Sequence, residues 1–353
     1  MKTPVLVLVG GFLGAGKTTL MLKAAEALHR RGLRAAIITN DQAGELVDTR
    51  LAQAAGLPTE EIAGGCFCCR FSDFTAAAER LLAVRPDVIL AEPVGSCMDI
   101  SATILQPLKH SWGASFRVAP YTVLVDAARA DSLLAPDADE RLASLFRHQL
   151  EEADLVFFSK ADLYSRFPEL PGGAAGTLSA RDAAGVERWL DLVLTGTGLA
   201  GARLLDIDYG IYAEAEAALG WLNYRAGLTL AVPLSPASVV GPLLDDLDAR
   251  LATAGASIMH LKVFDDSAAG PLRASICRTG EEPQVDGDLS ASPAPHHDLV
   301  VNLRALAAPE TLTALVDAAL AALPGRVEVE QRSAFRPAPP RPEQRYDRVI
   351  GAQ

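Results

Sequence analysis

The stretch that decides the fold is GGFLGAGKTTL, residues 10–20 of a chain of 353 residues. From Gly11 to Thr18 it fits the pattern G-x-x-x-x-G-K-[ST]. The apolar run Val5–Val9 precedes it, and a helical pattern follows from Thr18. A strand, a glycine-rich loop and a helix in this order are typical of a phosphate-binding loop. A glycine-rich turn with a chance lysine is the alternative. The context favours a nucleoside triphosphate site.

Each residue of this loop has an expected role. Glycines let successive backbone N–H groups point into one concavity around the β-phosphate. Lys17 adds a positive charge for the β and γ oxygens, and Thr18 offers its hydroxyl to Mg²⁺. The expected nucleotide-binding residues of the loop are Gly11, Gly14, Ala15, Gly16, Lys17, Thr18 and Thr19.

The first two hundred residues alternate apolar runs with amphipathic segments, which predicts an α/β domain. Thr18–Arg31 and Phe74–Val84 have helical periodicity, whereas the apolar runs lack polar alternation, as in a mostly parallel sheet with helices on both faces. The runs are Val5–Val9, Ala35–Thr39, Val88–Ala91, Thr122–Val125 and Leu155–Phe158. We therefore expect a P-loop domain over residues 1–200.

The rest of the chain predicts a second, smaller unit. After a connecting segment at 201–234, helices at Ser235–Ala254 and Pro309–Ala322 alternate with strands, which indicates an α+β domain over 235–331. The proline-rich residues 332–353 are expected to form an extended tail, because proline disfavours both helix and sheet.

Composition excludes several classes of protein. The net charge of −12 argues against nucleic acid as a partner, since a phosphate-backbone binder needs a basic face. No apolar run reaches the roughly 18 residues of a membrane span, and Val5–Val9 is too short for a secretory signal. Five cysteines, three of them clustered, do not suggest a disulfide framework. We expect a cytoplasmic protein with reduced thiols and no membrane partner.

A P-loop also needs a second acid to hold the metal or position water. Glu92, at the end of an apolar run in DVILAEPVGS (87–96), is the expected Mg²⁺ partner of Thr18, and Gly95 could present its N–H to the γ-phosphate. Asn40, Asp41 and Glu45 follow the second expected strand, where a γ-phosphate-sensing loop would lie. Lys17, Glu92 and Asp41 are the catalytic candidates. For the residues of the 40–45 segment an ordinary turn role explains the sequence equally well.

A second motif indicates which base is bound. VFFSKADL (156–163) gives Ser159-Lys160-Ala161-Asp162, close to the Asn/Thr-Lys-x-Asp stretch with which guanine is usually read. Asp162 can accept from two guanine donors, and the Lys160 stem can lie along the base. Downstream, Ser179 and Ala180 could present a backbone N–H to guanine O6. Together these residues favour GTP and GDP over ATP.

GGCFCC, residues 64–69, places Cys66, Cys68 and Cys69 within four positions. Core packing is one interpretation, and a redox pair at C-x-x-C spacing is another. The third is a metal site, since three thiolates from a compact turn suit a borderline-soft ion such as Zn²⁺ and leave one position open for a client's ligand. The metal site is the favoured interpretation. Cys97 and Cys277 are expected to pack in the core, and His296-His297 to be a solvated pair or, less readily, a metal ligand.

Taken together, GGFLGAGKTTL, GGCFCC, the ExxG acid Glu92, SKADL and VNLRAL (301–306) resemble the CobW-type GTPases, metallochaperones related to UreG and HypB. The resemblance implies a GTPase domain, a smaller CobW-type C-terminal domain, zinc or cobalt bound at C-x-C-C, and delivery of the metal to a client protein. This chain has NDQAGE where the family commonly has NEFGE, and Ser159 replaces the usual asparagine. It also lacks the histidine-rich stretch that many members carry.

Other functions fit part of the pattern. Cobalt handling or the maturation of a metalloenzyme, of the cobalamin or nitrile hydratase type, would use the same motifs. A P-loop small-molecule kinase with a structural zinc is a second alternative, although no arginine-rich acceptor pocket is evident. In a third, nucleotide only stabilises a scaffold. The sequence names neither the client nor the oligomeric state, and a homo-oligomer is compatible with it.

Overall fold

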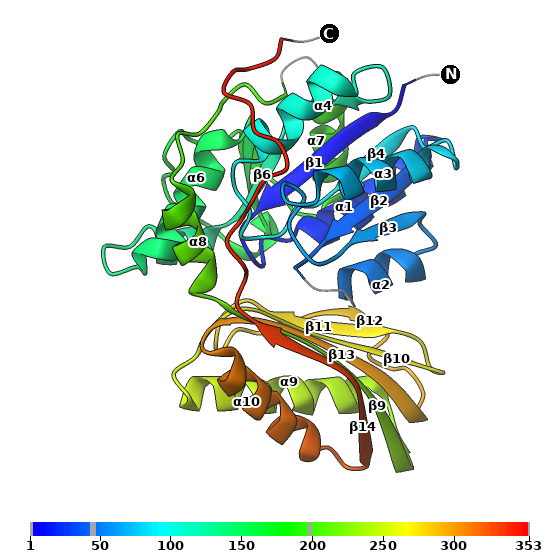
Figure 1. Ribbon diagram of the computed structural model, residues 1–353. Helices are drawn as coiled ribbons and strands as arrows, with labels where there is room; N and C mark the ends of the chain where they lie inside the picture. Colours follow the sequence, from blue (N-terminus) through cyan, green and yellow to red (C-terminus); the bar gives the residue numbers. More distant parts are fainter. Residues whose placement is uncertain (1–2, 43–46, 197–199, 352–353) are drawn as a thin grey trace. The chain divides into compact units, whose positions relative to one another are not determined.

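The computed structural model describes residues 3–42, 47–196 and 200–351 (Figure 1). These residues divide into two compact units. The first contains residues up to 42, 51–215 and 339 to the end. The second contains residues 43–50 and 216–338. The expected boundaries, at 200 and 235, treated the residues between them as a connection. In the structure this stretch holds α8 (Tyr209–Ala217) and a 15-residue strand, β9 (Gly220–Leu234).

The first unit is built on an eight-stranded, parallel sheet with the order β3-β2-β4-β1-β6-β7-β8, and β5 beside β1. The strands are β1 (Val5–Gly11), β2 (Ala35–Asn40), β3 (Thr59–Ile62), β4 (Val88–Ala91), β5 (Arg117–Val118), β6 (Thr122–Asp126), β7 (Leu155–Ser159) and β8 (Gly176–Thr177). The helices that lie wholly in this unit are α1 (Lys17–Arg30), α3 (Phe71–Leu82), α4 (Gln106–Ser111), α5 (Ala127–Leu133), α6 (Glu140–Glu152) and α7 (Ala183–Thr195). The helix α2 (Val47–Ala54) begins in the second unit and continues into the first from Leu51.

Both faces of this sheet are buried, which explains why its strands are continuous apolar runs. Val5, Val7 and Val9 of β1 pack with α1 and α7 in one core cluster. Leu6 and Leu8 point to the opposite face and are also fully buried. A strand that is covered on both sides has no solvent-facing positions at which polar residues would alternate. The mostly parallel α/β fold expected from the sequence is therefore confirmed.

The second unit is an antiparallel sheet, β12-β11-β10-β13-β9-β14, with two helices against one face. Its elements are β9, α9 (Pro236–Thr253), β10 (Ser257–Ser267), β11 (Leu272–Ile276), β12 (Gln284–Gly287), β13 (Ala294–Leu306), α10 (Pro309–Ala321) and β14 (Arg326–Phe335). In β9, every second residue from Leu222 to Leu230 lies in the core with α9 and α10. This period of two marks β9 as a central strand, paired with β13 and β14.

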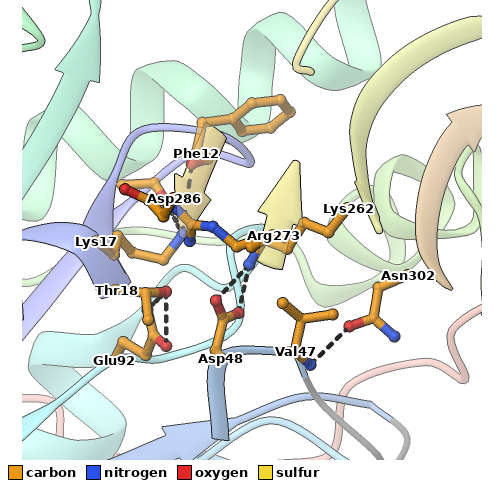
Figure 2. Close-up of polar contacts among 11 residues, drawn as sticks. Phe12, Lys17, Thr18, Val47, Asp48, Glu92, Lys262, Arg273, Asp286 and Asn302 are labelled. Carbon is orange, nitrogen blue, oxygen red and sulfur yellow. Dashed lines mark hydrogen bonds and ion pairs between the residues drawn. The ribbon is translucent and has the colours of Figure 1, made fainter. Parts of the chain in front are cut away.

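The opposite face of this sheet carries polar side chains that hold residues 47–50. Asn302 of β13 accepts from the N–H of Val47 at 3.1 Å, Lys262 of β10 forms an ion pair with Asp48, and Asp298 accepts from Arg50 at 3.2 Å (the first two in Figure 2). Lys262 and Asp48 are both largely buried, so each needs the other's charge. The chain just after the expected γ-phosphate-sensing loop is therefore bound to the second unit's sheet. Glu45 of that loop lies outside the described residues.

Within the described residues, no helix combines the length and the apolar character that crossing a membrane requires.

Candidate nucleotide site and cysteine cluster

The phosphate loop has the backbone conformation that its glycines predict. Gly14 and Gly16 have φ angles of 79° and 89°, in the left-handed region that favours glycine. Gly16 caps α1 without a side-chain hydrogen bond, and the first turn of this helix has no acidic residue. The N–H groups at the start of α1 thus face the loop, and the helix's own first turn contributes no acidic side chain that would compete for them. A helix N-terminus of this kind binds phosphate.

Lys17 and Gly95 lie close together at this loop. The Lys17 ammonium donates to the carbonyl oxygens of Gly11 at 2.9 Å and Phe12 at 3.4 Å (Figure 2). A Cβ added to Gly95 would be 2.9 Å from the Leu13 side chain and 3.1 Å from Lys17 Nζ. Only glycine lets the backbone after β4 come this near to the phosphate loop. The structure therefore brings the Gly95 backbone next to Lys17 of the phosphate loop.

Thr18 and Glu92 meet because β1 and β4 are neighbours in the parallel sheet. The Thr18 hydroxyl lies 3.0 and 2.9 Å from the two carboxylate oxygens of Glu92, which is 4% exposed (Figure 2). A hydroxyl and a carboxylate are the hard oxygen donors that Mg²⁺ prefers. This pair fits the expected magnesium site.

The expected base-reading residues are also brought together. Lys160 has a φ of 52° at the end of β7, and its ammonium lies 2.7 Å from an oxygen of Asp126. Asp162 accepts from the Ser179 hydroxyl at 2.6 Å and is 3.8 Å from Arg181. Asp162 and Ser179, 17 positions apart in sequence, thus form one polar cluster. Ala180 follows Ser179 in the same turn.

Asp126, the last residue of β6, was not among the expected site residues. Burial by itself would raise the pKa of its carboxyl, but the Lys160 ammonium, the Arg129 N–H and the Tyr164 hydroxyl together hold this pKa below its ordinary value. Asp126 therefore stays ionised and fixes Lys160 beside Asp162. Asp126 could have been identified from the sequence as an acidic residue at the end of an apolar run, the pattern that identified Glu92. Ser159, by contrast, is buried, and its hydroxyl has no hydrogen-bond partner among the described residues.

The three clustered cysteines form one compact group of thiols. Their sulfurs are separated by 2.8 Å (Cys66–Cys68), 3.4 Å (Cys66–Cys69) and 3.7 Å (Cys68–Cys69). Two sulfurs bound tetrahedrally to Zn²⁺ at about 2.3 Å would be about 3.8 Å apart. Two of the separations are close to that value, and only Cys66 and Cys68 need to part by about 1 Å. Within the described residues, this is the one cluster of His, Cys, Asp or Glu side chains found to be close enough to hold a metal ion.

The thiols share their protons unequally. Hydrogen bonds from Cys68, then Cys69 and Cys97, hold the pKa of Cys66 well below its ordinary value in spite of burial. The bond with Cys66 raises the pKa of Cys69 to about 11, with burial adding to the effect. The turn also leads directly into α3, whose N-terminus favours negative charge. Among the three clustered thiols, Cys66 is therefore the one whose surroundings most favour the thiolate.

Asn40 fastens this turn to the sheet. Its amide nitrogen donates to the carbonyls of Ile62 at 2.9 Å and Gly65 at 2.8 Å, and its oxygen accepts from the Phe67 N–H at 3.0 Å. Both N–H donors and the oxygen acceptor of the Asn40 amide are thereby hydrogen-bonded to backbone groups around the cysteines. The sequence placed Asn40 in a γ-phosphate-sensing loop, whereas in the structure its side chain orders the cysteine turn. Asp41, the proposed catalytic residue beside it, donates its backbone N–H to Ile62.

Cys97 differs from its expected role as simple packing. It is buried, and its thiol hydrogen-bonds to Cys66. It also lies only two residues after Gly95. Gln149 of α6 binds both residues, donating to the carbonyls of Gly95 at 3.0 Å and Cys97 at 2.8 Å. The segment after β4 thus touches the phosphate loop at one end and the thiols at the other.

His297, expected to be solvated, is buried in the second unit. One ring nitrogen lies 2.7 Å from Asp265 and the other 3.0 Å from the Ala294 carbonyl. Both nitrogens are therefore engaged, and neither is available to a metal. His296 is exposed, beside Thr229. The reason is the alternation of β13, which sends adjacent side chains to opposite faces.

The strand order, the phosphate loop and the Thr18–Glu92 pair define a P-loop nucleotide-binding domain. Residues 5–170 match the family model described as CobW/HypB/UreG, nucleotide-binding domain, in agreement with the sequence motifs.

Several solved structures are similar to the chain. HypB from Helicobacter pylori in complex with nickel is 19% identical over 55% of this chain and 87% of its own, with a TM-score of 0.41. HypB from Archaeoglobus fulgidus is 16% identical over 55% and 90%, with a TM-score of 0.38. Zn(II)-bound YjiA GTPase from E. coli is 16% identical over 92% and 99%, with a TM-score of 0.31. No curated protein sequence matches this chain.

Asn40→Ala should weaken metal binding by about 10–100-fold, because residues that orient metal ligands typically contribute this much. The measurement is a Co²⁺ titration followed by thiolate-to-metal charge-transfer absorption. Asn40→Asp is the matched control, since it keeps the acceptor for the Phe67 N–H but loses both donors. Its metal affinity should lie between those of the unaltered protein and Asn40→Ala. Equal affinities in all three proteins would show that the turn holds its shape without Asn40.

Proposed function

We propose that the protein is a GTP-hydrolysing metal carrier that binds a thiophilic transition metal, zinc first among them, and hands it to a client protein. The single observation that carries this proposal is the segment after β4. Gly95 lies at the phosphate loop, and Cys97 contacts the thiol cluster. Because Cys97 is only two positions after Gly95, a displacement of Gly95 caused by the γ-phosphate would also displace the residue that contacts the metal site.

The nucleotide site supplies the chemistry of hydrolysis. Thr18 and Glu92 would hold Mg²⁺, which when bound neutralises charge on the phosphates. Lys17 exchanges its carbonyl partners for phosphate oxygens, and the Gly95 N–H donates to the γ-phosphate. Asp41, at the carboxyl end of β2, is the proposed residue for positioning the attacking water. Asp162, held by Ser179, accepts from guanine, while Lys160 lies along its plane.

The thiol cluster supplies the cargo site. Cys66, Cys68 and Cys69 give three sulfurs, a set that suits Zn²⁺ and also accepts Co²⁺. Three ligands leave a position through which a client can take the metal. The five cysteines are free thiols, as a reducing compartment such as the cytoplasm requires. Cobalt delivery during maturation of a metalloenzyme would use the same residues, and metal content of the purified protein distinguishes the two.

Lys17→Ala should lower GTP hydrolysis by on the order of 10²–10³-fold while the protein stays folded, because the lysine charge is directed at phosphate and not at the core. Phosphate release and thermal unfolding followed by circular dichroism test the two parts. Unchanged turnover in a folded variant would remove the phosphate-loop assignment.

Asp162→Ala should weaken GTP binding by about 10–100-fold and leave ATP binding nearly unchanged, since a hydrogen bond to a charged group contributes about 1.5–3 kcal/mol. Titration with fluorescent GTP and ATP analogues measures both. Ser179→Ala, which loses only the hydroxyl that orients the carboxylate, should have a smaller effect. If affinity for both nucleotides falls together, Asp162 has a structural role.

Metal and nucleotide should be coupled. Zn²⁺ affinity should differ by roughly 5–150-fold between the protein with a non-hydrolysable GTP analogue and the GDP form, and by reciprocity Zn²⁺ should change GTP affinity by the same factor. Competition with a zinc-binding dye in each form measures this. Serine at all three clustered cysteines should abolish the difference and leave nucleotide binding in place.

Cys97→Ala tests the route of this coupling. It should reduce the nucleotide-dependent difference in Zn²⁺ affinity while three clustered thiols remain. Cys277→Ala, the loss of a buried thiol in the second unit, is the matched control. If the Cys97 variant keeps the full nucleotide-dependent difference in Zn²⁺ affinity, the coupling does not pass through Cys97. If the unaltered protein has the same Zn²⁺ affinity in both nucleotide forms, the metal site and the GTPase are not coupled at all.

A further inference from the structure

The end of the chain returns to the cysteine cluster. After β14 ends at Phe335 in the second unit, residues from 339 onward belong to the first unit. Residues 339–351 form an extended segment without helix or strand, drawn in red in Figure 1. We name residues 339–350 the C-terminal strap.

The strap contacts the cysteine turn directly. The backbone N–H of Arg341 donates to Cys69 Sγ at 3.1 Å, and the N–H of Glu343 donates to the Cys68 carbonyl at 3.0 Å. The Glu343 carboxylate accepts from both the N–H and the hydroxyl of Ser72, at the start of α3. The strap therefore spans the turn from its most exposed thiol to the helix that follows.

The prolines leave few backbone donors in this part of the strap. Pro339, Pro340 and Pro342 have no N–H, so Arg341 carries the single donor of this four-residue run. That donor is used on a sulfur. Proline also restricts the unfolded chain, so ordering the strap costs less conformational entropy than ordering an unrestricted tail.

Further along, the strap is anchored to a buried charge. Arg345 donates to the Asp99 carboxylate at 2.8 Å and to the Leu205 carbonyl at 2.7 Å. Asp99 is 1% exposed, and a buried carboxylate needs charged and polar partners, here Arg345 and the Tyr209 hydroxyl. Beyond it, the Tyr346 N–H donates to the Ala102 carbonyl and the Ile350 N–H to Gln106. The contacts at Cys69 are therefore held in place by anchors further along the strap.

We propose that the C-terminal strap is part of the metal site: it covers the thiols, donates a hydrogen bond to the Cys69 sulfur, and must lift before the metal can leave. This inference rests on the proposed function, since it requires metal at the three thiols. An N–H directed at a thiolate stabilises the negative charge that a bound metal leaves on sulfur. A client that takes the metal must approach Cys69, the least buried of the three, where the strap lies.

The test measures the rate of Zn²⁺ loss from the full chain to an excess of a coloured chelator, with the Co²⁺ charge-transfer spectrum as a second readout. A chain that stops after Ala338 keeps all of β14 and loses the strap. It should release Zn²⁺ at least about tenfold faster, as expected when a group supporting a metal ligand is removed.

Arg341→Pro removes one N–H and nothing else from the backbone. It should speed release and shift the charge-transfer band, whereas Arg341→Ala, which keeps the N–H, should behave as the unaltered protein. Residue 341 already precedes a proline, so the extended conformation is retained. Arg345→Ala should speed release by loosening the anchor, and Arg348→Ala, the loss of an exposed arginine in the same region, should not.

The outcomes are separable. If the full chain binds Zn²⁺ through its clustered thiols and all variants release it at the same rate, the proposed role of the strap is wrong and the proposed function stands. If Arg341→Ala accelerates release as much as Arg341→Pro, the guanidinium and not the N–H acts, which contradicts the proposed contact. If the full chain binds no metal, both proposals are overturned.

Discussion

The parallel pairing of β3, β2, β4 and β1 is the constraint on which the rest of the structure depends. Parallel strands place the loops that follow them at one edge of the sheet. Here these loops are the phosphate loop after β1, the Glu92 segment after β4, the Asn40 segment after β2 and the cysteine turn after β3. The nucleotide site and the thiol cluster are neighbours because their strands are neighbours.

The position of β4 between β1 and β2 gives the segment after it a double role. Glu92 accepts a hydrogen bond from Thr18, Gly95 lies against the phosphate loop, and Cys97 contacts the Cys66 thiol. Gln149 binds the backbone at both ends of the Gly95–Cys97 stretch and so makes it one stiff unit. A short, internally braced stretch transmits a displacement better than a loose loop, and this is the physical basis on which metal and nucleotide could influence each other.

Any negative charge on the clustered thiols lies in a buried environment and has to be balanced by neighbouring groups. Cys66 and Cys68 are almost fully enclosed, and a buried anion is costly unless donors surround it. The protein supplies neighbouring thiols, the start of α3 and the N–H of Arg341. A divalent cation would balance the remaining charge. The same enclosure that would favour a bound cation would also hinder its release.

The local motifs were readable from sequence because each depends on a few consecutive residues. The phosphate loop, the alternation of strands and helices, and the proximity of Cys66, Cys68 and Cys69 follow from backbone conformations and spacings within a single turn. Glu92 and Asp162 were found in the same way, as acids that end or follow apolar strands.

Only the tertiary structure decided the use of Asn40, Cys97, Asp126, His297 and the C-terminal strap. Asn40 could have faced a phosphate, but the position of β3 beside β2 gives its amide three backbone partners in the cysteine turn. His297 is buried because of its register in β13, and Arg341 meets Cys69 across 272 positions of sequence. Side chains alone do not reveal such partners, because long-range contacts are set by strand order and by where the chain returns, which depend on the packing of the whole unit.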